Sequence, residues 1–172
     1  MLEDNFLSLL DWCFNNSTEI VNTKDKSGNG KSLIHVASEL GLASVVQNLI
    51  KRGVDVDSKD SKNLTSLHIS AKKGHFEVAK TLLENAAKVD CVDDCQMTPL
   101  LLASKNGHLE IVKELLKLEA NVEGDGDANQ PLASAIEEGH IDVVKELLMN
   151  GADPNIEYET DLDYPQFPRK WS

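Results

Sequence analysis

Pairs of apolar residues recur along the chain at an interval close to 33 positions, and a polar turn follows each pair. The pairs are Leu49 with Ile50, Leu82 with Leu83, Leu115 with Leu116, and Leu147 with Leu148. A glycine precedes each pair at a similar distance, at Gly41, Gly74, Gly107 and Gly139. A period in this range is typical of stacked supersecondary units, none of which buries its apolar face alone.

The unit that begins at Thr98 predicts two short helices. Thr98 can cap the first helix, and Pro99 suits its opening turn because the N–H at that position has no helical partner. Gly107 ends this helix, since glycine readily adopts the left-handed conformation of a turn. The second helix is predicted from about Leu109 to Leu118, where apolar residues at helical spacing form one stripe.

The stretch from Thr98 to Ala103 resembles the ankyrin-repeat signature T-P-L-H-x-A. Looser copies begin at Ser32, Thr65 and Gln130, and residues 151–155 resemble the family's G-A-D-V-N turn. The resemblance covers residues 27–157. It implies an all-α fold, an ankyrin-repeat solenoid of stacked helix-turn-helix units joined by β-hairpin-like loops.

The repeat register predicts a division of the chain. Residues 1–26 are an N-terminal capping helix with the loop that leads into repeat one. Repeats one to four are residues 27–59, 60–92, 93–124 and 125–157. Residues 158–172 are a C-terminal tail or a truncated fifth repeat, and two interpretations stay open. Either a fifth repeat stops near Tyr164, or Tyr164, Phe167 and Trp171 cover the end of repeat four.

The net charge of −12 lies almost entirely in the second half of the chain. Residues 1–90 carry 11 − 12 = −1, and residues 91–172 carry 6 − 17 = −11. An acidic half repels phosphates, so no nucleic-acid partner is expected. No apolar run approaches the roughly 18 residues of a membrane span. Glu3 and Asp4 stand where a signal peptide needs positive charge. We expect a cytoplasmic protein, with the nucleus as a further location.

Three sequence patterns resemble nucleotide-binding or metal-binding motifs, but none is specific for such a site. Gly30, Lys31 and Ser32 match the end of a Walker A loop, but Asp25 occupies its first glycine position. The histidines follow the repeat period and so form a ladder rather than a metal cluster, and the ankyrin resemblance implies that they make structural hydrogen bonds. Cys91 and Cys95 have no second pair of ligands nearby. The sequence predicts no enzyme, no metal and no cofactor.

The resemblance implies a concave groove lined by hairpin tips and first helices. Its centre is predicted to be basic, with Leu64 and Met97 as apolar anchors and two glutamates on repeat four. The predicted partner-binding residues are Lys31, Lys62, Leu64, Lys72, Lys73, Met97, Lys105, Glu137 and Glu138. For any one of these surface lysines, a role in keeping the protein soluble is the simpler explanation. Because Lys72, Lys73 and Met97 are expected to lie off the core between repeats, substituting them should not unfold the array.

Two classes of function follow from the resemblance. The first is a protein–protein interaction module, a scaffold, adaptor or inhibitor, monomeric by itself, that binds an acidic or phosphorylated segment. The second is the regulatory or substrate-recruiting domain of a longer enzyme such as a kinase or ubiquitin ligase. The resemblance also implies hydroxylation of the turn asparagine, which only Asn155 retains.

Overall fold

The computed structural model describes residues 29–124 and 130–155. These residues contain eight helices and no strand, in agreement with the predicted all-α repeat fold. The helices are α2 (Leu33–Glu39), α3 (Ala43–Lys51), α4 (Ser66–Lys73), α5 (Phe76–Glu84), α6 (Pro99–Lys105), α7 (Leu109–Lys117), α8 (Pro131–Glu137) and α9 (Ile141–Met149). The predicted N-terminal cap, the C-terminal tail and residues 125–129 lie outside the described residues.

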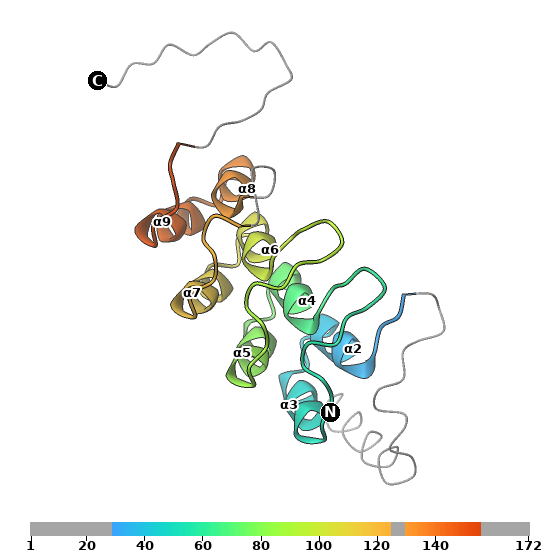
Figure 1. Cartoon of the computed structure of the whole chain (residues 1–172). Helices are drawn as coiled ribbons and strands as arrows, with labels where there is room; N and C mark the ends of the chain where they lie inside the picture. The colour runs from blue at the N-terminus through green and yellow to red at the C-terminus, as the bar shows by residue number, and fades with distance from the viewer. Residues whose placement is uncertain (1–28, 125–129, 156–172) are drawn as a thin grey trace, which may run out of the picture.

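The helices form two parallel rows (Figure 1). The first helices of the repeats, α2, α4, α6 and α8, each contact the next in one row. The second helices, α3, α5, α7 and α9, make the other row, and within each repeat the two helices also contact each other. The loops before α4 and α6 project from the first row, away from the second (Figure 1).

Local capping explains where the first helices begin. Thr98 stands in an extended conformation before α6, and its hydroxyl accepts the N–H of Leu101 at 3.1 Å, as predicted. Thr65 has the same role before α4, where the ring of His68 completes a capping box. Gln130 before α8 makes no side-chain cap. Gly107, with φ of +73°, turns the chain from α6 to α7.

One buried leucine or isoleucine from each helix builds a continuous core through the stack. The first row contributes Ile34, Leu67, Leu100 and Leu132, and the second row contributes Leu49, Leu82, Leu115 and Leu147. Burial of each such side chain stabilises the fold by about 1.5–3 kcal/mol. Because each leucine packs between neighbouring repeats, the stability of one repeat depends on the next.

Histidines at the start of the second helices tie adjacent repeats together. The Nε2 atoms of His75, His108 and His140 lie 3.0, 3.2 and 3.1 Å from the backbone carbonyl oxygens of Glu39, Lys72 and Lys105. Each bond reaches back to the preceding repeat. The structural role predicted for the histidine ladder is therefore confirmed.

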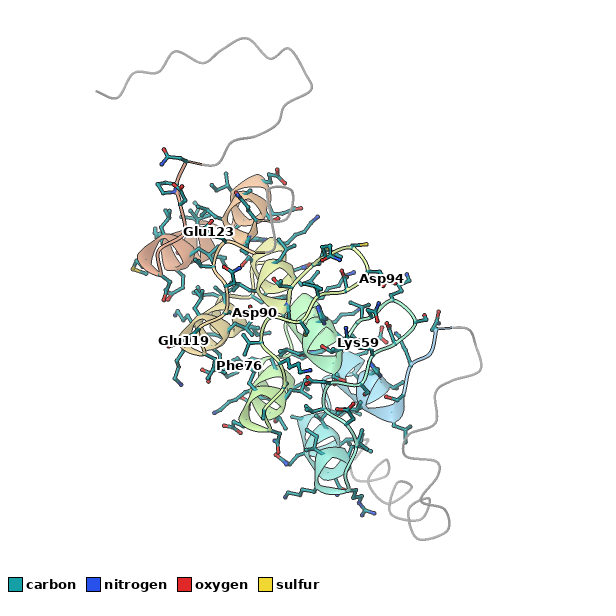
Figure 2. The ribbon with its side chains drawn as sticks, in the orientation of Figure 1. Lys59, Phe76, Asp90, Asp94, Glu119 and Glu123 are labelled. Carbon is teal, nitrogen blue, oxygen red and sulfur yellow. The ribbon has the colours of Figure 1, made fainter. Side chains whose placement is uncertain are left out.

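Carboxylates form a second set of links on the loops that follow the second helices. Oδ1 of Asp57 accepts the N–H of Lys88 at 3.0 Å, and Oδ1 of Asp90 accepts the N–H of Asn121 at 3.0 Å. Glu123 continues the series to the next repeat (Figure 2). These links join each loop to its equivalent in the following repeat.

Candidate protein-binding groove

The hairpin loops that border the groove are held by one buried aspartate each. Oδ1 of Asp60 accepts the N–H groups of Lys62 and Leu64 at 2.8 and 3.0 Å. In the next loop, Oδ1 of Asp93 accepts the N–H groups of Cys95 and Met97 at 2.8 and 2.9 Å. Because both loops have the same internal bonds, they present Leu64 and Met97 at equivalent places.

The two loops are also joined to each other. The N–H of Asp94 donates to the carbonyl oxygen of Lys62 at 3.1 Å, and Asp94 lies on the part of its loop that projects from the helices (Figure 2). One repeat earlier, the N–H of Ser61 donates to the carbonyl oxygen of Asn29 at 3.0 Å. These links between loops make a firm edge for the groove.

A first hollow of about 220 Å³ lies between the loop of repeat two and the ends of α2 and α4. Its lining combines cationic side chains with an apolar floor. The lining residues are Lys31, Glu39, Leu64, His68, Ile69, Lys72 and Lys73. Of its two aliphatic residues, Ile69 is buried and Leu64 is half-buried.

A second hollow of about 400 Å³ adjoins it between repeats two and three. Its lining residues are Lys62, Leu64, Lys72, Asp93, Asp94, Cys95, Met97 and Leu102. Leu64 and Lys72 belong to both hollows, so the two form one continuous depression across repeats one to three. We call this depression, with the linings just given, the lysine groove.

The cations of the lysine groove are not equivalent. The Nζ atom of Lys31 lies 2.6 Å from Oε2 of Glu39, and this hydrogen bond lowers the pKa of the Glu39 carboxyl. Lys62, Lys72 and Lys73 make no ion pair with any described residue. Their three charges are exposed at the rim. A ligand carboxylate or phosphate would find three cations there that hold no ion pair, beside the carboxylates of Glu39, Asp93 and Asp94 that also line the groove.

The structure brings together six of the nine predicted residues and separates three. Lys31, Lys62, Leu64, Lys72, Lys73 and Met97 all line the lysine groove. Lys105 ends α6 and lines neither hollow, and Glu137 and Glu138 are exposed at the end of α8 in repeat four. Lys105 holds in α6 the position that Lys72 holds in α4, so it lies one repeat further along the stack than the lysines that line the two hollows.

The expectation that Met97 lies off the core is wrong. Met97 is half-buried and packs against the buried apolar residues, because hydrogen bonds of its N–H with Asp93 and of its carbonyl oxygen with His68 hold it there. The predicted binding residues also leave out seven residues that line the groove: Glu39, His68, Ile69, Asp93, Asp94, Cys95 and Leu102. Leu64 and Met97 stand immediately before the helix caps, and the repeated Asp four residues before each of them is a signal that could have indicated their fixed geometry.

Cys91 is held in a structural environment. Its Sγ lies 3.5 Å from the Thr65 hydroxyl and 3.3 Å from the carbonyl oxygen of Lys88. Burial raises the pKa of the Cys91 thiol, which keeps the less nucleophilic, protonated form at neutral pH. Within residues 29–124 and 130–155, no three His, Cys, Asp or Glu side chains gather closely enough to hold a metal ion. No described helix could span a bilayer, since the longest have nine residues.

Asn155, the predicted hydroxylation site, is exposed at the end of the described chain. Its Nδ2 lies 2.9 Å from Oδ1 of Asp153, which also accepts the backbone N–H of Asn155 at 2.9 Å. Exposure makes the side chain accessible to a modifying enzyme. Hydroxylation stays a prediction, which the intact mass after incubation with an asparaginyl hydroxylase would test.

A family model described as ankyrin repeats (3 copies) matches residues 2–93 and 85–158. No curated protein matches the chain. The matched residues cover most of the sequence, and the described part shows the helix pairs, capping threonines and repeated hairpin loops that the resemblance implied. The chain therefore belongs to the ankyrin-repeat family.

Proposed function

We propose that this protein binds a segment of a partner protein in the lysine groove. The segment carries an acidic or phosphorylated side chain next to an apolar one. Ankyrin repeats generally act as protein–protein interaction modules and are typically non-catalytic. The choice of groove and ligand chemistry is our inference from the residues of this chain.

The observation that carries the proposal is a set of three lysines that make no ion pair with a described residue. They line the same groove as two half-buried apolar side chains. Lys62 and Lys72 line the second hollow with Leu64 and Met97, and Lys73 lines the first hollow with Leu64. On α7, by contrast, Lys113 and Lys117 pair with glutamates on their own helix, at 3.3 and 3.4 Å. Like charges gathered without compensation repel one another, and an anionic ligand relieves that repulsion.

The apolar floor supplies the second half of the recognition. Charges at a rim mainly raise the association rate, whereas an apolar side chain in a desolvated pocket lengthens the life of a complex. The second hollow, of about 400 Å³, accommodates a large apolar side chain against Met97 and Leu102. The hydrogen bonds within the loops hold the hollow open before binding, which lowers the entropic cost.

The test is a selection from a random peptide library displayed on phage. On the unaltered protein we expect enrichment of peptides with an acidic residue close to an apolar one. Lys72→Glu with Lys73→Glu should abolish their binding, because the reversed charges repel the acidic ligand. The matched control is Lys113→Glu with Lys117→Glu, which makes the same charge change on α7 outside the groove. Peptides that bind all three proteins equally would overturn the proposal.

A further inference from the structure

The last described repeat exposes an apolar surface that the other three repeats bury. Ile136 in α8 is 48% exposed. The equivalent positions are Ser38, Ala71 and Ser104, each fully buried. These three residues are covered because another repeat follows them. The exposure of Ile136 thus marks the side of repeat four on which a fifth element would stack.

Helix α9 shows the same contrast. Leu148 is 41% exposed, whereas its equivalent Leu116 in repeat three is 9% exposed. Ile141 is 67% exposed, and its equivalents Leu109 and Phe76 are half-buried. Large apolar side chains at these positions lose contact with water only when something covers them.

Gly139 gives independent evidence that the described residues leave this end of the stack uncovered. A Cβ built on Gly41, Gly74 or Gly107 would meet the histidine ring of the next repeat at 2.9, 2.5 and 2.6 Å respectively. Gly139 has the same left-handed conformation, yet nothing described lies within 4 Å of its Cβ position. A histidine ring fills the space beside the equivalent glycine in each earlier repeat, but no described atom fills it beside Gly139. We call Ile136, Gly139, Ile141 and Leu148 the terminal face.

We infer that residues 167–171 of this chain cover the terminal face. The segment reads Phe-Pro-Arg-Lys-Trp and places two large aromatic side chains on either side of two cations. The apolar part of the face matches Phe167 and Trp171. In the earlier repeats, an aromatic histidine ring fills the space that is open beside Gly139. Phe167 and Trp171 each supply an aromatic ring.

Charge complementarity also favours this segment. Arg169 and Lys170 are the only basic residues after Asn155. Glu137 and Glu138 lie next to Ile136 and Gly139, are exposed, and make no ion pair with a described residue. The acidic stretch from Glu157 to Asp163 has no such match on this face. The basic, aromatic end of the tail is therefore the better occupant.

The connection is long enough for this arrangement. About 12 residues separate Asn155 from Phe167, and a chain of that length spans up to about 40 Å when extended. Asn155 lies six residues after the end of α9, which carries part of the terminal face. The segment can thus fold back on its own repeat, and no second molecule is needed.

Tryptophan fluorescence tests the inference on the full chain. The sequence contains two tryptophans, Trp12 and Trp171, so a Trp12→Phe background reports Trp171 alone. We expect blue-shifted emission and weak quenching by acrylamide. Ile141→Glu should shift the emission to longer wavelength and strengthen quenching, because it puts charge on the face. Leu40→Glu is the matched control, since Leu40 is 60% exposed but lies in repeat one. It should leave Trp171 unchanged.

A second measurement, in the native Trp12 background, is hydrogen exchange of a Phe167→Ala, Trp171→Ala variant. We expect exchange in α8 and α9 to speed up at least about tenfold, which corresponds to about 1.4 kcal/mol. Three results would overturn the inference: Trp171 already exposed in the Trp12→Phe chain, equal responses to Ile141→Glu and Leu40→Glu, or unchanged exchange. A burial of Trp171 that depends on protein concentration, with a dimer mass by light scattering, would also overturn it in favour of a second copy.

Discussion

The Nε2 atom of His68 in repeat two lies 3.0 Å from the carbonyl oxygen of Met97 in repeat three. On the other side of the ring, the N–H of Thr65 donates to Nδ1 at 3.2 Å. Nδ1 is therefore an acceptor, and the proton of the neutral ring sits on Nε2, which donates to Met97. One side chain thus caps its own helix and fixes the loop that carries an anchor of the lysine groove.

This geometry predicts a pH-dependent stability. Burial lowers the pKa of His68 below 6.5, and it outweighs the Met97 carbonyl and the Asp93 carboxylate, which raise the pKa. The unfolded chain therefore binds a proton first as the pH falls. The contribution of His68 to stability is complete above about pH 6.5 and is lost between there and the lowered folded pKa. Protonation of Nδ1 would also remove the acceptor for Thr65.

The variant that tests this is His68→Leu, because Leu101 is buried at the equivalent position of repeat three and shows that leucine fits there. At neutral pH we expect the free energy of unfolding in urea to drop by about 1–3 kcal/mol, since two hydrogen bonds are lost. Between about pH 7 and about pH 5 the variant should lose less stability than the native protein. Identical pH profiles would contradict the role assigned to His68.

Gly74 and Gly53 form a natural pair for testing contact between repeats. Both have φ in the left-handed region, +78° and +85°, but a Cβ at Gly74 would lie 2.5 Å from Cε1 of His108, whereas nothing lies within 4 Å of a Cβ at Gly53. Alanine at either position costs about 1–2 kcal/mol of backbone strain. Gly74→Ala should cost a further 1–3 kcal/mol or so, because the His108 ring must move off the Lys72 carbonyl. Urea unfolding measures both, and equal losses would contradict the ring contact.

Repeat four should be the least protected part of the described array. Its first helix lacks a side-chain cap, and its apolar residues are the most exposed. Because the stability of a repeat array is roughly a sum of repeat and interface terms, we expect amides of α8 and α9 to exchange faster than those of α4 to α7. Hydrogen exchange with mass spectrometry resolves the helices. Uniform protection would be inconsistent with this prediction.

A single substitution should strengthen that repeat. Gln130 has the extended conformation of a cap residue, with φ of −83° and ψ of 127°, but its side chain makes no cap bond. Gln130→Thr copies Thr98 and should stabilise α8 by about 1 kcal/mol, seen as slower exchange. Gln130→Val has the same shape without the hydroxyl and serves as the control. If valine slows exchange as much as threonine, the gain does not come from capping.

Met97→Ala should affect both folding and binding, since Met97 packs against the core and lines the lysine groove. We expect a loss of about 1–2 kcal/mol in unfolding free energy. Dissociation of a peptide selected on the groove should be about tenfold faster. The control is Met149→Ala, the same change at a mostly exposed methionine of α9. A similar effect of both on peptide dissociation would exclude Met97 as an anchor.

The sequence alone determined the features that depend on local chemistry and on the repeat period. The helices, the caps at Thr65 and Thr98, the turn at Gly107 and the structural histidines all follow from residues a few positions apart. Periodicity then extends each local rule to every repeat. That is why the family and the stacked all-α fold could be predicted without coordinates.

Only the tertiary structure decided which surface residues meet. Lys31 pairs with Glu39 and Met97 packs against the core, while Lys105 lines neither hollow of the groove. The terminal face likewise appears only when the burial of Ile136 is compared with that of Ser104. These contacts depend on how loops project and on whether another repeat follows. The repeat period specifies neither how a loop projects nor whether another repeat follows, because it describes each unit and not its neighbours.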